Sequence, residues 1–363
     1  MITGISIQNF RGFRDMTLDG LARVNLLVGD NGSGKTALLE PVFLAMSNSP
    51  LAALQLRQVR GLDGIAARLG AAQPVAPQVL YDFLGEGANE ARIATRGQPP
   101  FARSLRVGQD PGRPILLAPN GPPTAGADTT QQPVVLPQSN VLAVPMVFEW
   151  RDSDGNVGTS SAQIGPTGMT TGAAGVSYVA TQFVSAGQDG QGGAATVFSA
   201  LDRAGEAQPF IDEMKQQFRE LEVIAVQLEG ARPLLHGRLT GQKHQRPLEM
   251  LSGGITRLAL ILLTLAAPDF HVVLIDEIEN GLHHSRFPLL WQQIRAFAAR
   301  FDTQVFATTH SQECLDAAAD AMAAEPEDFA LLRTVRTADG CRVGLLPGLE
   351  ARHLLRSGLE VRG

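Results

Sequence analysis

The feature that most constrains this chain is a glycine-rich segment that follows an apolar run near its beginning. Residues 29–36 read GDNGSGKT, which satisfies the pattern G-x-x-x-x-G-K-[ST], and they lie between the run VNLLVG and a helical stretch from Lys35 to about Ser47. Glycines at these positions let the backbone wrap around phosphate groups, and the first N–H groups of the helix attract the anion. The alternative is a plain strand-to-helix turn, which the complete pattern disfavours. The segment therefore predicts a phosphate-binding loop.

The side chains of this loop indicate what it binds. Lys35 has the length and charge to reach the β- and γ-phosphates of a nucleotide, and the hydroxyl of Thr36 is a ligand for Mg²⁺. Only Lys35, Lys215 and Lys243 are lysines among the 30 basic residues, which makes the lysine of the loop conspicuous. The other nucleotide contacts that the loop predicts are Gly29, Asn31, Gly32, Ser33 and Gly34.

A second candidate element is an apolar run that ends in two adjacent carboxylates, HVVLIDE. In nucleotide-hydrolysing folds, an acid at such a strand end supports Mg²⁺, and another acid orients or deprotonates the attacking water. Asp276 is the candidate for the metal, and Glu277 is the candidate catalytic base. An acidic strand end alone is more often a solvated surface feature, but the phosphate-binding loop upstream favours the catalytic interpretation.

The segment LSGG begins the apolar helix that precedes the acidic strand. A helix that starts with Ser252, Gly253 and Gly254 offers its first N–H groups to an anion, which makes a second phosphate site. A phosphate-binding loop does not need a second site for its own nucleotide, so the second site implies a partner subunit. The alternative is an ordinary helix cap, in which the side chain of Ser252 accepts hydrogen bonds from those N–H groups.

His310 ends the run TQVFATTH, which predicts a further strand of the same sheet. Because neighbouring parallel strands end at the same edge of a sheet, this histidine is a candidate contact to the γ-phosphate that senses hydrolysis. A lone histidine at a strand end is more often structural. His283 and His284 are adjacent, a spacing that suits no metal site, and we interpret them as surface or interface residues.

Alternating strand and helix signals predict an α/β fold with a mostly parallel sheet that helices cover on both faces. Between residues 97 and 175, glycine and proline become frequent around short β-like runs, namely PILLAP, VVLPQ and VPMVFEW. We therefore predict an N-terminal lobe that carries the phosphate-binding loop (1–95), an inserted β- or loop-rich subdomain (96–200), and a C-terminal lobe that carries the other candidate elements (201–363).

Two local patterns give further structural expectations. The run GQDGQGG at 187–193 predicts a flexible hinge. Helical spacing predicts a helix over 209–221 with one buried face, formed by Phe210, Met214, Phe218 and Leu221.

Composition excludes several classes of protein. With 44% hydrophobic and 18% charged residues among 363, the chain can bury a large core, which excludes a disordered chain. Cys314 and Cys341 have neither disulfide nor zinc spacing, so we expect core thiols in a reducing compartment. No apolar run reaches the roughly 18 residues of a membrane span, and the N-terminus alternates like a strand, so we expect a cytoplasmic protein without a membrane partner. A net charge of −6 argues against a surface built wholly for nucleic acid.

The ordered set GDNGSGKT, LSGG, VLIDE and TTH resembles the ABC-type ATPase head, the P-loop NTPase fold of transporter motors, SMC-like proteins, RecF and the OLD family. The segments NFRGF, VLIDEIENGLHHS and VFATTHSQEC are similar to stand-alone bacterial AAA-type ATPases of the OLD and RecF-like branch. The resemblance covers residues 1–60 and 205–320 and leaves the inserted region unaccounted for.

The resemblance implies a head-to-tail dimer that hydrolyses ATP with Mg²⁺. Each ATP lies between the phosphate-binding loop of one subunit and the LSGG segment of the other. Lys35 and Thr36 then bind phosphate and Mg²⁺, Asp276 supports Mg²⁺, Glu277 is catalytic and His310 is the switch histidine. Asn9 and Arg11 match positions that contact nucleotide or couple to DNA in this branch.

The chain departs from the family pattern at two points. Ile255 stands where many signature segments have glutamine. The glutamine of the Q-loop is not assigned, and the candidates are Gln55, Gln58, Gln73 and Gln78.

The resemblance suggests a switch that controls a separate effector. The OLD family usually continues into a C-terminal TOPRIM nuclease domain, and this chain ends within about fifty residues of TTHS, so we expect a separately encoded nuclease partner in antiphage defence or DNA metabolism. The alternative is a RecF-like clamp that ATP closes on DNA. Residues 331–363 hold six arginines and three acids, which could meet phosphates but more often form a solvated surface. A transporter motor is a third and weaker interpretation.

Overall fold

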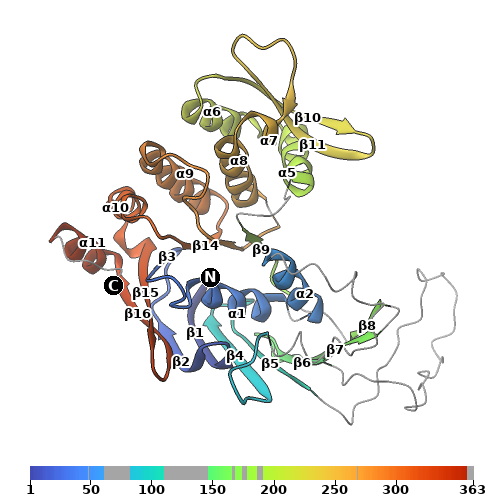
Figure 1. The fold of residues 1–363 in the computed structure, drawn as a ribbon, viewed down its shortest axis with the longest axis vertical. Coiled ribbons are helices and arrows are strands. Elements are labelled where there is room, and N and C mark those ends of the chain that lie inside the picture. The colour runs from blue at the N-terminus through green and yellow to red at the C-terminus, as the bar shows by residue number, and fades with distance from the viewer. Residues whose placement is uncertain are drawn as a thin grey trace, which may run out of the picture.

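The computed structural model describes residues 1–47, 49–60, 82–109, 146–165, 168–173, 178–185, 191–267 and 269–357. Its central sheet has six strands in the order β16-β15-β3-β14-β13-β9 (Figure 1). The bounds are β3 (Val24–Val28), β9 (Thr181–Val184), β13 (Val272–Ile275), β14 (Gln304–Thr308), β15 (Phe329–Thr337) and β16 (Gly340–Pro347). All neighbours in it are parallel except the hairpin pair β15 and β16, which confirms the predicted mostly parallel sheet.

A second sheet has the order β2-β1-β4-β5-β6-β7-β8 and is antiparallel throughout. The bounds are β1 (Ile2–Phe10), β2 (Phe13–Asp19), β4 (Glu90–Gly97), β5 (Arg103–Gln109), β6 (Met146–Arg151), β7 (Val157–Gly165) and β8 (Gly168–Ala173). Helix α1 (Lys35–Ser47) lies between the two sheets, and α2 (Pro50–Val59) follows it. Because α1 contacts apolar side chains on both sides, every residue from Leu38 to Met46 is buried.

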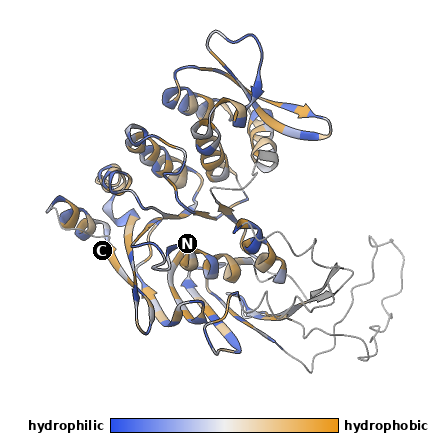
Figure 2. Ribbon diagram, in the orientation of Figure 1, coloured by the Kyte–Doolittle hydropathy of each residue, from blue (hydrophilic) through white to orange (hydrophobic). Residues whose placement is uncertain are grey.

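The other face of the central sheet is covered by helices whose buried apolar residues form a second core. In Figure 2 these helices carry both hydrophobic and hydrophilic residues. The helices are α5 (Gln191–Ala204), α6 (Gln208–Gln217), α7 (Leu248–Leu251), α8 (Gly253–Ala266), α9 (Phe287–Arg300), α10 (Gln312–Ala321) and α11 (Gly348–Arg356), with short 3-10 turns η2 (His284–Arg286) and η3 (Pro326–Asp328). A small sheet of β10 (Leu221–Glu229), β11 (Arg232–Leu239) and β12 (Arg246–Pro247) lies beside α5. In β13, Val272 and Leu274 face one core while Val273 and Ile275 face the other, which is why the strand is apolar throughout.

The described strands of the predicted insertion do not form a sheet of their own. β4 pairs with β1, so β5 to β8 extend the N-terminal sheet outward by one antiparallel strand after another. β9 returns to the central sheet and pairs with β13. Of the β-like runs, VPMVFEW overlaps β6 from Met146 to Trp150, whereas PILLAP and VVLPQ lie outside the described residues. The boundaries at 95 and 200 stay a prediction.

Two local expectations need correction. The helix predicted over 209–221 ends at Gln217, and Leu221 begins strand β10, although Phe210, Met214 and Phe218 are buried as expected. Helical spacing could not predict where the helix ends, because Leu221 is a buried residue of a strand and happens to continue the spacing. Of the hinge predicted over 187–193, residues 191–193 instead form the first turn of α5, and residues 187–190 lie outside the described residues. In the part of the chain that is described, no helix has the length and hydropathy of a membrane span.

Candidate active site

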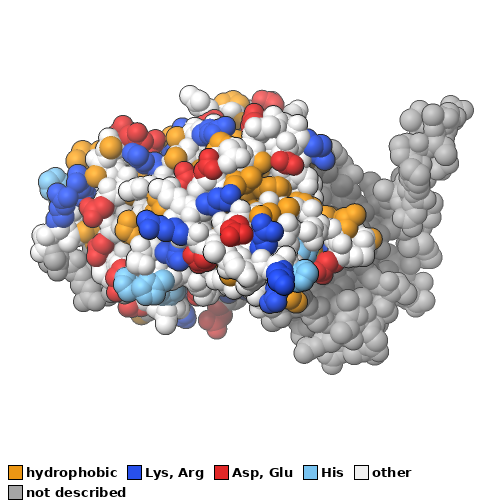
Figure 3. Space-filling view, turned by 90° about the horizontal axis from the view of Figure 1, so that it is seen from above, with side chains coloured by type: hydrophobic (Ala, Val, Ile, Leu, Met, Phe, Trp, Pro, Cys, Tyr) orange, Lys and Arg blue, Asp and Glu red, His pale blue; other side chains and the backbone are white. Residues whose placement is uncertain are grey.

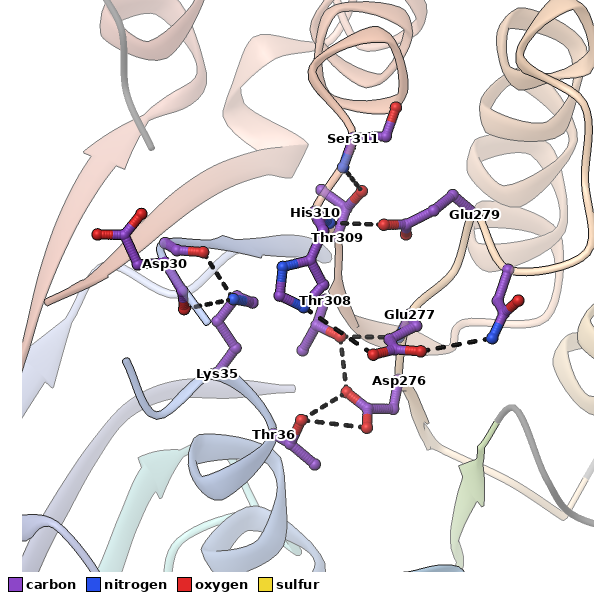
Figure 4. Close-up of polar contacts among 12 residues, drawn as sticks. Asp30, Lys35, Thr36, Asp276, Glu277, Glu279, Thr308, Thr309, His310 and Ser311 are labelled. Carbon is purple, nitrogen blue, oxygen red and sulfur yellow. Dashed lines mark hydrogen bonds and ion pairs between the residues drawn. The ribbon is translucent and has the colours of Figure 1, made fainter. Parts of the chain in front are cut away.

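Three parallel strands deliver the candidate elements to one edge of the central sheet. β3 leads into the phosphate-binding loop, β13 into the acidic pair, and β14 into His310. β14 lies between the other two, with Ala307 opposite Ile275 and Thr308 opposite Leu27. The predicted side chains therefore converge at the carboxyl ends of these strands (Figure 4).

The loop has a backbone that only glycine adopts easily. Gly29, Gly32 and Gly34 have φ of 144°, 76° and 107°, in the region that disfavours side chains. Nζ of the buried Lys35 donates to the carbonyl oxygens of Gly29 and Asp30 at 2.6 and 2.9 Å, so the lysine spans the loop. Burial lowers the pKa of Lys35, and the nearby carboxylate of Asp276 partly offsets that effect.

The hairpin of β15 and β16 contacts the phosphate-binding loop through Thr334. The hydroxyls of Ser33 and Thr334 are 2.6 Å apart and both residues are buried. Thr334 also donates to the carbonyl oxygen of Val28 at 3.1 Å. No local sequence pattern marks Thr334, because its contacts depend on the pairing of β15 with β3.

Asp276 faces the loop across the sheet edge. The Thr36 hydroxyl donates to its two carboxylate oxygens at 2.9 and 3.1 Å, and the Thr308 hydroxyl donates to one of them at 2.7 Å. A hydroxyl and a carboxylate this close supply the oxygen ligands that Mg²⁺ prefers, so Thr36 and Asp276 fit the ion.

Glu277 has a left-handed backbone, with φ of 49°. For a residue with a side chain this conformation costs roughly 1–2 kcal/mol, and such strain is typical of functional positions. Its carboxylate is half-exposed, and Oε1 lies 4.0 Å from Nε2 of His310. Asn280 Nδ2 contacts the other carboxylate oxygen at 3.4 Å. The candidate base and the candidate switch histidine therefore lie side by side (Figure 4).

Residues that the sequence did not single out hold this arrangement in place. Arg257, on α8, donates to the carbonyl oxygens of Ser185 at 2.7 Å and Asp276 at 2.6 Å. Burial lowers the pKa of this arginine, which is only 6% exposed. A carboxylate oxygen of Glu279 accepts from the backbone N–H of His310 at 2.6 Å. These side chains bind backbone atoms of other elements, so no local pattern marks them.

A cleft of about 930 Å³ opens beside the loop. Its lining includes Lys35, Thr36, Glu277 and His310, and also Asn9 near the end of β1 and Arg11 from the turn after it. Asn9 and Arg11 both have positive φ, 56° and 48°. The two residues predicted to contact nucleotide thus lie at the cleft.

Arg11 has a second arginine beside it in the cleft wall. Glu40, which is 1% exposed, forms ion pairs with both Arg11 and Arg60, and both guanidinium groups line the cleft. One buried carboxylate cannot neutralise two guanidinium groups, so this wall keeps a positive charge. The Q-loop candidates Gln55 and Gln58 are exposed on α2 and are absent from the described lining, while Gln73 and Gln78 lie outside the described residues.

The LSGG segment is not among the described residues that line this cleft. Ser252 has an extended backbone, and within the described chain its side chain makes no capping hydrogen bond, which contradicts the ordinary cap. A methyl group added to Gly253 would meet no described atom within 4 Å, whereas one added to Gly254 would lie 2.9 Å from the carbonyl oxygen of Gly281. The helix start is therefore open on one side and packed on the other.

The two cysteines differ in burial, and the two adjacent histidines are exposed. Cys314 is a core thiol as expected, and burial raises its pKa to about 12. The expectation of a core thiol was wrong for Cys341, which is partly exposed and lines the cleft. His283 and His284 are exposed, as expected of surface residues.

Two families match parts of this chain. Residues 183–316 match the family described as "AAA domain, putative AbiEii toxin, Type IV TA system", and residues 1–53 match the family described as "AAA ATPase domain".

Curated relatives share parts or most of the sequence. The DNA replication and repair protein RecF of Cytophaga hutchinsonii is 32% identical over 123 residues, which cover 33% of this chain and 31% of RecF. This chain therefore spans about a third of that relative's length. An ATP/GTP phosphatase of Helicobacter pylori is 22% identical over 354 residues, with 87% of each chain covered.

Solved structures show the same fold. An SMC head bound to the C-terminal winged-helix domain of ScpA has a TM-score of 0.50 at 13% identity, with 95% of this chain and 98% of that chain covered. An SMC head with an extended coiled coil, bound to a domain of ScpA derived from Pyrococcus furiosus, has a TM-score of 0.50 at 10% identity, with 98% of each chain covered. Together with the partial matches to two ATPase families, these similarities show that the chain has the fold of an ABC-type ATPase head.

Proposed function

We propose that this chain is a Mg²⁺-dependent ATPase of the OLD-like branch whose ATP-bound dimer is a conformational switch. Each ATP lies between the cleft of one subunit and residues 252–254 of its partner. The observation that carries the proposal is the division of the site into two halves: Lys35, Asp276 and Glu277 converge at one place, while Ser252 begins an open helix elsewhere.

The geometry supports a direct hydrolytic mechanism. The loop N–H groups bind the phosphates, and Lys35 exchanges the carbonyl oxygens of Gly29 and Asp30 for phosphate oxygens. Thr36 would hold Mg²⁺ and Asp276 would support it, and the ion would supply positive charge that neutralises the phosphates. Glu277 accepts a proton from the attacking water.

Two further contacts complete the nucleotide site of this proposal. His310 contacts the γ-phosphate from its position beside Glu277, so loss of that phosphate removes a contact at the subunit interface. Asn9 and Arg11, which line the same cleft, also contact the nucleotide. The second subunit supplies the helix N-terminus at residues 252–254 to the same γ-phosphate.

The proposed output of the switch is control of a separate effector, a nuclease that acts in antiphage defence or DNA metabolism. The motifs shared with the OLD-like branch support this output, as does the similarity of residues 183–316 to domains described in a toxin–antitoxin system. A phage challenge of cells that carry the chain with its neighbouring genes tests it. Protection that depends on Lys35 and Glu277 supports the output, and equal plaque counts with and without the genes contradict it.

Mixing two inactive variants tests the sandwich itself. Lys35→Ala removes the loop contact, and Ser252→Arg blocks the helix start. In a mixed dimer, the intact loop of the Ser252→Arg subunit faces the intact LSGG segment of the Lys35→Ala subunit, so one complete site forms. We expect ATPase activity to return on mixing, up to about half of the wild-type activity per mixed dimer, because one of its two sites is complete. Activity that stays at the sum of the two variants contradicts a site shared between subunits.

A RecF-like clamp on DNA is the second candidate function. The 32% identity with RecF favours it, and Arg352 and Arg356 lie on α11 in the basic C-terminal region. On the face shown in Figure 3, however, Lys and Arg side chains alternate with Asp and Glu and do not form one continuous patch. Arg356 itself lies 3.8 Å from Asp320.

Binding of duplex DNA in the presence of ATP, with a steep salt dependence that Arg352→Ala and Arg356→Ala reduce, supports the clamp. Absent or salt-independent binding contradicts it.

A further inference from the structure

We infer that Thr308 is a positioning residue that sets both carboxylates of the catalytic pair through one hydroxyl group. Thr308 is the last residue of β14 and is 1% exposed. This inference rests on the proposed roles of Asp276 and Glu277. It adds Thr308, which has no role in the proposed function.

The hydroxyl of Thr308 has a contact in each direction. It donates to a carboxylate oxygen of Asp276 at 2.7 Å and accepts from the backbone N–H of Glu277 at 2.8 Å (Figure 4). A hydroxyl has one proton to donate and lone pairs to accept, so both contacts are satisfied at once. The two neighbouring residues of the pair are thus tied to the same oxygen atom.

The backbone of Thr308 fixes the next residue as well. Its carbonyl oxygen accepts from the N–H of Ile278 at 3.0 Å. The left-handed Glu277 therefore has hydrogen bonds from Thr308 on both of its flanking peptide groups. Arg257 holds the carbonyl oxygens of Asp276 and Glu277, at 2.6 and 3.2 Å, from the other side. A side-chain substitution at Thr308 removes the hydrogen bonds of the hydroxyl but leaves the hydrogen bond of the backbone carbonyl oxygen.

The two hydroxyls on Asp276 are not equivalent. Thr36 donates to Asp276 here, but in the nucleotide complex its oxygen is the proposed ligand of Mg²⁺. The bond from Thr308 involves no proposed ligand and can persist in both states. Thr308 is therefore the residue that keeps the orientation of the Asp276 carboxylate when the Thr36 hydroxyl binds Mg²⁺.

A set of variants separates this role from simple packing. Thr308→Ser and Thr308→Ala differ by one oxygen atom, and both lack the methyl group. Thr308→Val keeps the shape and removes the hydroxyl. Thr309→Val is the matched control, because Thr309 is equally buried and its oxygen accepts from Ser311 N at 3.1 Å.

Two measurements on each purified variant test the inference. The first is the steady-state kcat and KM for ATP. The second is Mn²⁺ binding to the complex with a non-hydrolysable ATP analogue, followed by the electron paramagnetic resonance signal of free Mn²⁺. For Thr308→Ala and Thr308→Val we expect kcat to fall on the order of 100-fold at nearly unchanged KM, and Mn²⁺ affinity to fall about 10-fold. Thr308→Ser should restore both quantities, and Thr309→Val should keep them.

The outcomes distinguish this inference from the proposed function. If wild-type protein does not hydrolyse ATP, or Glu277→Gln hydrolyses it at the normal rate, the proposed function fails and the inference fails with it. If Glu277→Gln is inactive but Thr308→Ala matches Thr308→Ser in kcat and Mn²⁺ affinity, the inference alone is overturned. A poorly folded Thr308→Val leaves the Ser and Ala pair to decide, because melting temperature is measured for both.

Discussion

The hydroxyl of Thr36 lies 2.9 Å from a carboxylate oxygen of Asp276, although 240 positions separate the two residues in the chain. The first follows β3 and the second follows β13, and β14 lies between these strands. The contact therefore depends on the order of strands in the sheet. It connects the phosphate-binding loop with the acidic pair, and it defines the place where nucleotide chemistry is expected.

Replacing Glu277 with glutamine should separate ATP binding from hydrolysis. The amide keeps the shape of the side chain but cannot accept the proton of water, so we expect kcat to fall about 10²- to 10⁴-fold. The melting temperature should stay unchanged, because the carboxylate is half-exposed and its contact to Asn280 is 3.4 Å long. Phosphate release and fluorescent ATP binding measure the two properties, and normal release by a stable variant contradicts the assigned base.

Alanine at two neighbouring glycines should give opposite results. Gly254→Ala places a methyl group 2.9 Å from the carbonyl oxygen of Gly281, so we expect a loss of about 1–3 kcal/mol in the free energy of unfolding. Gly253→Ala meets no described atom, so stability should be kept, while ATP-driven dimerisation should be lost. Denaturant unfolding and light scattering test the pair. A Gly253→Ala protein that dimerises normally with ATP would show that this surface does not face the nucleotide of a partner.

The two cysteines should react at very different rates with a maleimide. Cys314 is buried with a pKa raised to about 12, and its thiol accepts from Trp291 Nε1 at 3.4 Å, so it should stay unmodified in folded protein. Cys341 is partly exposed in the cleft and should react, although burial raises its pKa as well. ATP should slow its modification. Mass spectrometry with Cys341→Ser as the control measures both effects, and labelling that ATP leaves unchanged argues against nucleotide in this cleft.

ATP affinity should depend on pH through Lys35. Burial lowers the pKa of this lysine below its ordinary value of 10.5 in the free protein, and bound phosphate raises it again. Because the protonated form binds phosphate, affinity should be full at neutral pH and should fall as pH rises through the lowered pKa. Titration calorimetry from neutral pH upward should also show proton uptake on binding in that range. Lys35→Arg stays charged there and should give a flat profile, so a parallel fall in both proteins contradicts this origin.

Local patterns were sufficient for the residues that carry the proposed chemistry. The loop, the acidic pair and His310 each follow an apolar run, and parallel strands bring such ends together. The supporting residues could not be found in this way, because Thr308, Arg257 and Thr334 act through contacts between elements far apart in the chain. The order of the strands in the sheet determines which hydroxyl contacts which carboxylate, and local sequence patterns do not reveal that order.

The error at Leu221 has a similar origin. Leu221 continues the helical spacing of Phe210 and Met214, yet it is buried as the first residue of a strand. The composition that predicts an inserted subdomain does not show how its strands pair, and the hydrogen bonds of β4 and β5 continue the sheet of β1. Burial alone does not identify the element that buries a side chain.

The measurement that tests the central claim most directly is the solution mass of the Glu277→Gln protein by light scattering. The mass is compared with and without ATP and Mg²⁺ over a range of protein concentration. A sandwich dimer predicts that ATP converts monomer to dimer, and that Ser252→Arg in the same background prevents the conversion. An identical mass with and without ATP, at every concentration, contradicts an ATP-driven dimer.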